Sequence, residues 1–429
     1  MSPRELYELG EIPELGVVPP KMHAWVIRKD RHGPPLESFR REVVDVPEIS
    51  ADEVLVLVMA SGVNYNGVWA GLGDPLSPCD VHGRDYHIGG SDASGVVWKV
   101  GSAVRRWKVG DEVVVHCNHT CGQCHNCNGG DPMLCREQKI WGYETADGAF
   151  AQFTRVQAQQ LVPKPKNLTW EQAGCYMLVL ATAFRMLYGH PPHTLQPAMN
   201  VLVWGGAGGL GSMAIQLIKA AGGNAIAVVS SEERGKWCLD IGAKAYINRT
   251  RFDCWGPLPS TKDRAAYKQY LRRVQQFGKA IWEITGKNVD PDIVFEHPGE
   301  QTFPVSCYVC RRGGMVVFCA GTTGFNLTFD AAYVWMRQKR IQGSHFATLM
   351  QADAANHSVM DGRVLPCMSQ VFDFDRIPEA HDLMWRNAHP PGNMALMVNA
   401  PMQGLHNLEE TRALALSGST GLAEVPSRG

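Results

Sequence analysis

Apolar and polar residues alternate in short runs from Met22 to about Val115, as in HAWVIR, EVLVLVMA and SGVVWKV. A period of two predicts strands with one buried face, and the Gly, Pro and Asp residues between the runs predict tight turns. The first part of the chain is therefore expected to be an antiparallel β domain.

The period changes to that of a helix near Leu168, and Thr169 is the expected N-cap of a helix through TWEQAGCYMLVLATAFRML. The later runs VLVWGG, AIAVVSS, DIVFEHPG and GGMVVFCAG predict strands, with helical segments such as SMAIQLIKAA between them. This alternation predicts a doubly wound parallel sheet, so the fold class is α/β. The polar stretch 251–287 lengthens one crossover and is expected to be a partly helical insertion.

The length of 429 residues favours two domains, each with a substantial core. We expect a β-rich domain with a cysteine-rich lobe at 1–178 and a nucleotide-binding domain at 179–348. Residues 349–429 are expected to return to the first domain and end in a tail. Lys and Arg total 41 against 42 Asp and Glu, which argues against nucleic acid or an anionic membrane as partner. No apolar run approaches the roughly 20 residues of a membrane span, and the charged N-terminus is unlike a signal peptide, so we expect a cytoplasmic protein.

A glycine-rich loop joins the strand VLVW to the following helix and completes the spacing G-x-G-x-x-G. Such a loop lets the backbone approach a pyrophosphate, whose charge the N–H groups at the helix start favour. In isolation the motif is often only a turn, but its position between a strand and a helix favours nucleotide binding. The expected contact residues are Gly206, Gly208, Gly209, Leu210 and Gly211.

The next strand ends at Ser230 and Ser231, where an NAD-selective site commonly carries a carboxylate for the ribose hydroxyl. The two hydroxyls, followed by Arg234, suit a 2'-phosphate instead, so NADPH is the expected cofactor. Glu232 and Glu233 lie beside them and would favour NADH if either carboxylate faced the ribose.

Four of the thirteen cysteines have the spacing C-x2-C-x2-C-x7-C. Four thiolates at this spacing surround one tetrahedral zinc ion and leave no open coordination position, so the site would be structural. Free thiols in an unmetallated loop are the alternative. The residues concerned are Cys121, Cys124, Cys127 and Cys135.

The cysteine spacing resembles the structural-zinc lobe of zinc alcohol dehydrogenases in the medium-chain dehydrogenase/reductase superfamily. Where that family places a Cys and a His on its catalytic zinc, this chain has Asn64 and Ser91, which argues against zinc-assisted alcohol oxidation. Read together, VNYNGVW, WGYETADGAFAQF, LTWEQA, VWGGAGGLGS, DIVFEHPGEQTFP and KRIQGSHFA resemble crotonyl-CoA carboxylase/reductase over nearly the whole chain. The resemblance implies a GroES-like β-rich catalytic domain beside a Rossmann domain.

The resemblance also implies a reaction. Hydride passes from NADPH to the β-carbon of an α,β-unsaturated acyl-CoA, and the α-carbon of the resulting enolate attacks carbon dioxide. The product is an alkylmalonyl-CoA such as ethylmalonyl-CoA, whereas protonation of the enolate yields the saturated acyl-CoA. Carbon dioxide is not held by charge pairing, so it needs a few fixed donors in a site that excludes water.

Four residues are carried over from the family motifs to the carbon dioxide site. The resemblance implies that Asn66 donates its amide to carbon dioxide, that His345 holds it through a water, and that Glu144 orients this water. Tyr143, at a position where some relatives have Phe, closes the site. Taken one at a time, Asn66 is as readily a turn cap, Glu144 a partner of a surface cation and His345 a core histidine.

Cationic side chains are expected beside the phosphates of the acyl-CoA substrate. The candidates are Arg312, Arg337, Lys339 and Arg340, with a solvated basic face as the alternative. Ala332 departs from the family pattern, which usually has Arg there. The family also implies a homotetramer or homodimer.

Two rival functions remain open from the sequence. The first is a non-carboxylating NADPH-dependent enoyl-CoA or quinone reductase with the same fold. The second is a catalytically idle NADPH-binding protein, against which the candidate site and the balanced charge argue.

Overall fold

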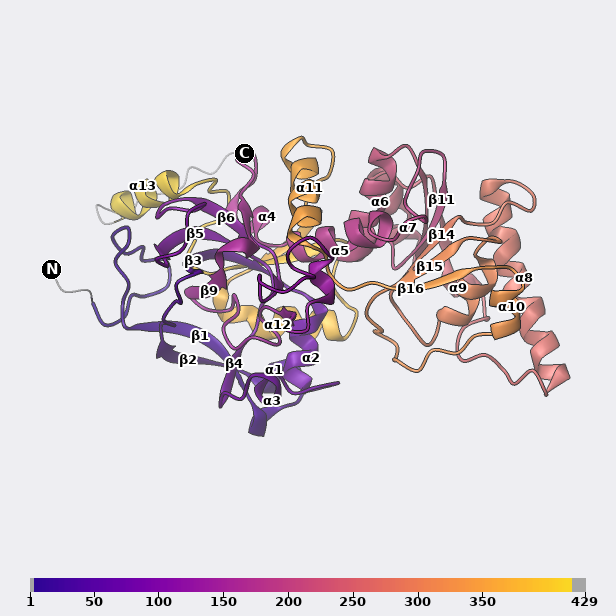
Figure 1. Cartoon of the computed structure of the whole chain (residues 1–429), viewed down its shortest axis with the longest axis horizontal. Helices are drawn as coiled ribbons and strands as arrows, with labels where there is room; N and C mark the ends of the chain where they lie inside the picture. The colour runs from indigo at the N-terminus through magenta and orange to yellow at the C-terminus, as the bar shows by residue number, and fades with distance from the viewer. Residues whose placement is uncertain (1–3, 419–429) are drawn as a thin grey trace, which may run out of the picture. The chain divides into compact units, whose positions relative to one another are not determined.

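The computed structural model describes residues 4–418, and the chain divides into two compact units (Figure 1). Unit 1 comprises Met1–Leu178, Thr348–Asn356 and Met368–Gly429, and unit 2 comprises Val179–Ala347 and His357–Cys367. The return to the first domain, which we expect from residue 349, is therefore interrupted where 357–367 join unit 2. Residues 419–429 of the expected tail lie outside the described part. Within 4–418, no helix combines the length and the apolarity that crossing a membrane requires.

Unit 1 is built on a seven-stranded sheet of order β10-β6-β5-β3-β18-β17, in which β9 also pairs with β3. A three-stranded sheet, β2-β1-β4, and the small hairpin β7-β8 accompany it. Apart from the parallel pair β17–β18, neighbouring strands are antiparallel, as the alternating sequence predicts. The strands are β1 (Lys21–Arg28), β2 (Phe39–Asp45), β3 (Glu53–Gly62), β4 (Tyr86–Ile88), β5 (Ala93–Val100), β6 (Glu112–Val115), β7 (Asn118–His119), β8 (Lys139–Ile140), β9 (Phe153–Gln157), β10 (Leu161–Pro163), β17 (Met368–Phe372) and β18 (Asn393–Met397).

Short helices fill the connections of unit 1, and two helices, α5 and α11, cross from one unit into the other along the chain. The helices are α1 (Pro35–Ser38), α2 (Tyr65–Leu72), α3 (Pro78–His82), α4 (Trp170–Ala173), α5 (Met177–Tyr188), α11 (Leu349–Met360), α12 (Ile377–Trp385) and α13 (Leu408–Gly418). Single 3-10 turns in this unit are η1 (Lys29–Arg31), η2 (Pro132–Leu134), η3 (Ala158–Gln160) and η5 (Phe374–Arg376).

The single helix expected after Thr169 is in fact two helices. Thr169 does cap α4, because its hydroxyl accepts from Gln172 N at 3.4 Å and the Gln172 side chain accepts from Thr169 N at 3.1 Å. The helix then stops at Gly174, where a Cβ would lie 2.9 Å from the backbone of Ala60 in β3. The sequence pattern does not reveal this close passage of the chain against the sheet, which separates α4 from α5.

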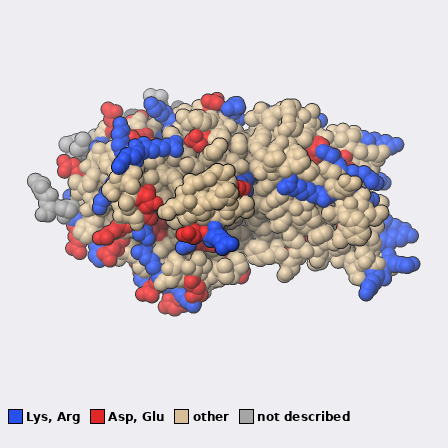
Figure 2. Space-filling model, viewed as in Figure 1, with Lys and Arg blue, Asp and Glu red and all other residues tan. Residues whose placement is uncertain are grey.

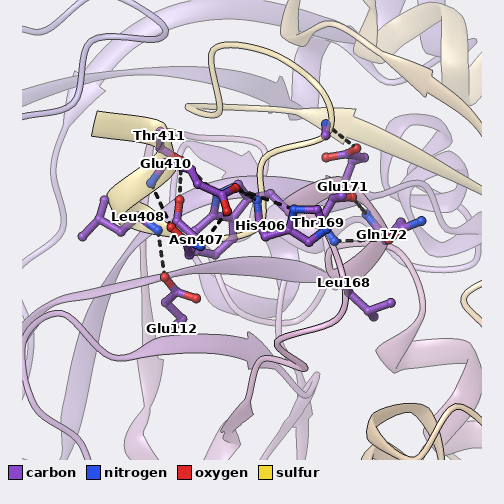
Figure 3. A network of polar contacts seen from close by, with 12 residues as sticks. Glu112, Leu168, Thr169, Glu171, Gln172, His406, Asn407, Leu408, Glu410 and Thr411 are labelled. Atoms are coloured by element: carbon purple, nitrogen blue, oxygen red, sulfur yellow. Dashed lines mark hydrogen bonds and ion pairs between the residues drawn. The ribbon is translucent and has the colours of Figure 1, made fainter. Parts of the chain in front are cut away.

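Hydrogen bonds hold the segment before α13 against unit 1 (Figure 3). The Lys164 ammonium donates to Leu168 O and to His406 O, each at 2.6 Å, and the Glu112 carboxylate accepts from Leu408 N at 2.8 Å. Lys164 is almost fully buried, and burial lowers its pKa to about 8. The final helix therefore belongs to the folded part of the unit.

Unit 2 contains a six-stranded parallel sheet of order β13-β12-β11-β14-β15-β16, which confirms the doubly wound prediction. The strands are β11 (Asn200–Trp204), β12 (Asn224–Val229), β13 (Ala245–Asn248), β14 (Ile293–Glu296), β15 (Met315–Phe318) and β16 (Arg340–Gly343). The crossovers contain α6 (Gly209–Ala220), α7 (Glu232–Asp240), the 3-10 turn η4 (Arg249–Arg251), α8 (Arg264–Thr285), α9 (Phe303–Val309) and α10 (Ala331–Trp335).

The expected insertion forms α8, whose apolar side packs on the sheet of unit 2. Trp204, at the end of β11, stacks on Phe277 of α8 with ring centroids 5.7 Å apart, and Trp255 meets both rings edge-on. Residues 249–287 carry nine Lys and Arg against three Asp and Glu. Figure 2 shows Lys and Arg side chains gathered over the part of unit 2 that contains α8. The insertion thus extends the core on one side and presents cations to solvent on the other.

Candidate active site

The glycine-rich loop of unit 2 leaves β11 and enters α6. A Cβ on Gly206 would lie 2.7 Å from the Ala227 side chain, and one on Gly211 would lie 2.4 Å from Gly205 O, so both positions require glycine for packing. Gly208, the N-cap of α6, has only Gly205 O at 3.4 Å near the corresponding point. The open side of this loop lies at the helix start, where N–H groups favour a phosphate. Gly209 and Leu210 form the first turn and are partly exposed there.

The carboxylate of Glu232, which from sequence is a potential ribose acceptor, is engaged elsewhere in unit 2. It accepts from Asn248 Nδ2 at 2.8 Å, from Tyr246 Oη at 2.9 Å and from Arg251 at 2.8 Å. These hydrogen bonds lower its pKa, that from Asn248 the most. Ser231 caps α7 by accepting from Arg234 N at 3.2 Å, and Ser230 is exposed. The end of β12 therefore presents the hydroxyls of Ser230 and Ser231 beside exposed Glu233, and the engagement of Glu232 favours a cofactor with a 2'-phosphate.

Asn66 lies in the first turn of α2, in unit 1. Its Nδ2 donates to Ser91 Oγ at 2.6 Å, so the side chain does not cap the helix. Asn64, which precedes α2, donates through Nδ2 to Asp92 Oδ2 at 2.8 Å. An amide has two N–H donors, so Asn66 keeps a second donor for a ligand.

Tyr143 and Glu144 follow Gly142 in a turn after β8. Gly142 has φ +75°, and a Cβ there would lie 2.0 Å from Gly90 O, so only glycine permits this turn. Tyr143 is buried, its hydroxyl donates to Leu76 O at 2.9 Å, and burial raises its pKa to about 12. Glu144 Oε2 accepts from Ile140 N at 2.7 Å. The phenol is therefore neutral, and the carboxylate is held by the turn that carries it.

The loop Gly89–Asp92 contacts both the start of α2 and the turn that carries Tyr143 and Glu144. On one side, Ser91 binds the amide of Asn66 at 2.6 Å. On the other, Gly90 packs against Gly142, and Gly90 O accepts from Ala149 N at 3.0 Å. The α2 start and the Trp141–Glu144 turn, which are far apart in sequence, thus flank one loop.

His345 belongs to unit 2 and follows β16. The next residue, Phe346, has φ +35°, a strained conformation for a side chain of this size, and the two rings lie 4.3 Å apart. Partial desolvation and then the charge of Arg185 lower the pKa of His345, so its imidazole is neutral near pH 7. Unit 2 therefore contains His345 and the glycine-rich loop, and unit 1 contains Asn66, Tyr143 and Glu144.

Asn64 and Ser91, which the sequence resemblance matches to the catalytic zinc ligands of zinc alcohol dehydrogenases, lie in a hydrogen-bonded network. Asn64 and Ser91 are engaged with Asp92 and Asn66, and neither side chain is a usual zinc ligand. Throughout residues 4–418, the one group of His, Cys, Asp or Glu side chains arranged to hold a metal is the four-cysteine cluster.

The four-cysteine cluster has the geometry of a structural zinc site. The Sγ–Sγ distances are 3.6 Å for Cys124–Cys127, 3.6 Å for Cys121–Cys135 and 3.8 Å for Cys121–Cys127. Zn–S bonds of about 2.3 Å in a tetrahedron place sulfurs roughly 3.8 Å apart. The N–H groups of Gln123 and Cys124 also donate to Cys121 Sγ, and they lower its pKa to about 7. The lobe therefore fits a bound zinc ion.

The four candidate cations for the CoA phosphates differ in their surroundings. Lys339 is buried and donates to Cys307 O at 2.7 Å and to Tyr308 O at 2.9 Å, and Arg340 donates to His190 O and Pro191 O. Arg337 lies over the ring of Tyr333, which stacks in turn on Tyr308. Arg312 is exposed and Arg337 is partly exposed. Lys339 and Arg340 stabilise unit 2, which leaves Arg312 and Arg337 as the accessible cations of the four.

Sequence reasoning missed Asp92. It is completely buried, and desolvation raises its pKa to about 7 although Asn64 and Leu178 N donate to it. The signal in the sequence is an acidic residue at the start of an apolar strand, in GGSDASGVV, where a solvated turn residue is the usual interpretation. Its partners come from three separate segments, so the pattern alone does not identify it.

Two family models match the chain: the alcohol dehydrogenase GroES-like domain at residues 50–166 and the zinc-binding dehydrogenase at residues 209–359. The chain is 61% identical to crotonyl-CoA carboxylase/reductase of Cereibacter sphaeroides, over 95% of this chain and 94% of that protein. A solved crotonyl-CoA carboxylase/reductase superposes with a TM-score of 0.93 at 64% identity, covering 96% of both chains. Crotonyl-CoA carboxylase/reductase AntE in complex with NADP superposes with a TM-score of 0.90 at 49% identity, covering 93% of this chain and all of that one.

Proposed function

The chain belongs to the crotonyl-CoA carboxylase/reductase family of medium-chain dehydrogenases, and from this premise we propose its reaction. It catalyses the NADPH-dependent reductive carboxylation of an α,β-unsaturated acyl-CoA of the crotonyl-CoA type. The product is an alkylmalonyl-CoA such as ethylmalonyl-CoA. The observation that carries the proposal is the Gly89–Asp92 loop, which joins Asn66 to the turn of Tyr143 and Glu144 where related dehydrogenases hold a catalytic metal.

The cofactor assignment follows from the nucleotide loop and from Glu232. The glycine-rich turn suits a pyrophosphate, and Glu232 is bound to Tyr246, Asn248 and Arg251. When bound, NADPH supplies a hydride to the β-carbon of the substrate, and the electron pair of the double bond moves onto the α-carbon and thioester oxygen as an enolate. The α-carbon then forms a bond to the carbon of carbon dioxide, and one C–O π bond becomes a carboxylate.

The residues of this chain decide whether the enolate meets carbon dioxide or a proton. The remaining N–H of Asn66 donates to an oxygen of carbon dioxide, and Glu144 and neutral His345 act through a bound water. The Tyr143 hydroxyl donates to Leu76 O, so its proton is engaged within unit 1. These features favour carboxylation over simple reduction.

The remaining parts of the proposal concern binding and assembly. Arg312 and Arg337 bind the phosphates of the acyl-CoA, and the cysteine lobe binds one structural zinc ion. The active protein is a homodimer or homotetramer, as its family membership implies.

Product analysis tests the proposed reaction. The purified chain is incubated with crotonyl-CoA, NADPH, labelled bicarbonate and carbonic anhydrase, and acid-stable label and butyryl-CoA are measured. We expect most NADPH consumed to appear as labelled product. If the chain oxidises NADPH without incorporating label, it is a non-carboxylating reductase. If no enoyl-CoA or quinone supports NADPH oxidation, the idle binding protein is correct.

Substitutions then test the site residues. Asn66→Ala, Glu144→Gln and His345→Ala should each lower the ratio of carboxylated to reduced product by about tenfold, the effect of losing one discriminating hydrogen bond. Asn224→Ala is the matched control, because the side-chain amide of this Asn in unit 2 donates to Ala198 O at 3.1 Å, at the surface. An unchanged ratio in all three variants would exclude these residues from carbon dioxide binding.

A further inference from the structure

We propose that Ser91 and Asp92 are positioning residues that orient the amide of Asn66 toward carbon dioxide. The inference rests on the proposed function and deepens it. It concerns only unit 1 and the hydrogen bonds that join the Gly89–Asp92 loop to the start of α2.

Ser91 holds the side-chain amide of Asn66 by a buried hydrogen bond. Its Oγ accepts from Asn66 Nδ2 at 2.6 Å, and the Ser91 side chain is 1% exposed, so water does not replace it readily. The two ends of an amide have nearly the same shape and opposite hydrogen-bonding character. Without Ser91, the Asn66 side chain can turn and present its carbonyl oxygen to an oxygen of carbon dioxide, which repels it.

Asp92 fixes the segment that carries Asn66. Its Oδ2 accepts from Asn64 Nδ2 at 2.8 Å, and its Oδ1 accepts from Leu178 N, in the first turn of α5, at 2.7 Å. Its backbone carbonyl accepts from Ser61 Oγ at 2.7 Å, at the end of β3. One fully buried residue therefore ties together the end of β3, the start of α2 and the start of α5.

The ionised form of Asp92 suits these contacts, because both side-chain partners are N–H donors and a carboxylate is an acceptor only. Burial nevertheless raises its pKa to about 7. The ionisable side chains that face Asp92 are Cys117 and Tyr176, and Cys175 lies next to Tyr176. Burial raises the pKa of both Cys117 and Tyr176. Protonation of Asp92 replaces an acceptor with an O–H that faces a donor, which weakens the tie to Asn64.

The first test compares two buried serines. Ser91→Ala removes the acceptor of Asn66, whereas Ser94→Ala removes an equally buried hydroxyl that donates to Trp170 O at 2.6 Å. We expect Ser91→Ala to lower the ratio of carboxylated to reduced product about tenfold, with kcat/KM for crotonyl-CoA changed less than threefold, and Ser94→Ala to keep the ratio. An unchanged ratio in Ser91→Ala, or an equal loss in Ser94→Ala, overturns the role of Ser91.

The second test exchanges donor and acceptor between Asn64 and Asp92. Asp92→Asn places an amide N–H against the Asn64 amide and should lower the product ratio. Adding Asn64→Asp restores a donor–acceptor pair, while the amide oxygen at position 92 still accepts from Leu178 N, so the ratio should recover. This exchange decides the inference even if Ser91→Ala does not fold. A double variant no better than Asp92→Asn alone contradicts the positioning role of Asp92.

The pH profile separates positioning from general loss of structure. With carbon dioxide held at one partial pressure at every pH, the carboxylated fraction of the unmodified protein should fall as the pH decreases through about 7. The profile of Asp92→Asn should be flat in this range, and the same titration in both proteins would contradict the inference. If the unmodified protein forms no carboxylated product at any pH, the proposed function itself fails, which is a separate result.

Discussion

Gly67→Ala should destabilise the protein because the added methyl has no space. Gly67 follows Asn66 in α2, and a Cβ there would lie 2.5 Å from His381 Nε2 and 2.8 Å from His381 Cδ2. The His381 ring does not swing aside readily, because it is fully buried between Phe39 and Phe150 and its Nδ1 bonds to Ile377 O at 2.8 Å. The helix must therefore shift, and Asn66 shifts with it.

The magnitude follows from two opposing contributions. Overpacking of a filled core costs about 1–3 kcal/mol. The higher helix propensity of Ala returns about 1 kcal/mol, so we expect a net loss of up to about 2 kcal/mol. Gly278→Ala in α8 is the matched control: apart from the neighbouring helix backbone, no atom lies within 4 Å of its added Cβ, and it should gain up to about 1 kcal/mol.

Thermal unfolding and product analysis together test this prediction. At about 2–4 °C per kcal/mol, Gly67→Ala should lower Tm by up to roughly 8 °C, and Gly278→Ala should keep or raise it. Gly67→Ala should also lower the ratio of carboxylated to reduced product, which Gly278→Ala leaves unchanged. In the double variant with His381→Ala the two losses should not add, because the smaller side chain makes room for the methyl. Equal Tm values for the two glycine variants would refute the reasoning.

Three further perturbations probe other parts of the structure. Elemental analysis of the unmodified protein should detect one zinc ion per chain, and Cys127→Ser should lose it. An unmodified protein without zinc would contradict the proposed zinc site. Burial raises the pKa of Glu296 from 4.5 to about 7, so the folded state binds its proton more tightly than the unfolded state. The difference in unfolding free energy between the unmodified protein and Glu296→Gln, measured by urea unfolding, should therefore shift by about 3 kcal/mol against the unmodified protein as pH rises from about 4.5 to 7. A difference that does not depend on pH would contradict this prediction. Lys164→Met leaves Leu168 O and His406 O without the donor that Lys164 provides, so limited proteolysis should cut the segment before α13 faster. An unchanged rate would show that the other contacts are enough to hold this segment in place.

Local patterns predicted much of the fold. The alternation in EVLVLVMA and SGVVWKV corresponds to β3 and β5, and the strand–loop–helix order around Gly206 corresponds to β11 and α6. These elements depend on residues near one another in the chain, where periodicity is informative. The helix after Thr169 was predicted too long, because the close approach of Gly174 to β3 ends α4 and no local pattern encodes that approach.

The candidate site was predictable only in its residue types. Motifs predicted Asn66, Tyr143 and Glu144, but not that Ser91 bonds Asn66 while Gly90 packs against Gly142 beside Tyr143. The ambiguity over Glu232 was resolved by Tyr246 and Asn248 on the neighbouring strand β13. Lys339 and Arg340 look like ligand-binding cations in sequence, and their carbonyl partners become apparent only in the folded unit.

The sequence by itself determined the period of each element, the order of strand, glycine loop and helix, and the spacing of four thiols, because each depends on near neighbours along the chain. Tertiary structure alone decided which polar groups meet. The exclusion of water raises the pKa of Asp92, and the hydrogen bonds from Asn64 and Leu178 N to its carboxylate oppose that shift. Burial and hydrogen-bond partners are properties of the packed chain, since distant segments supply both.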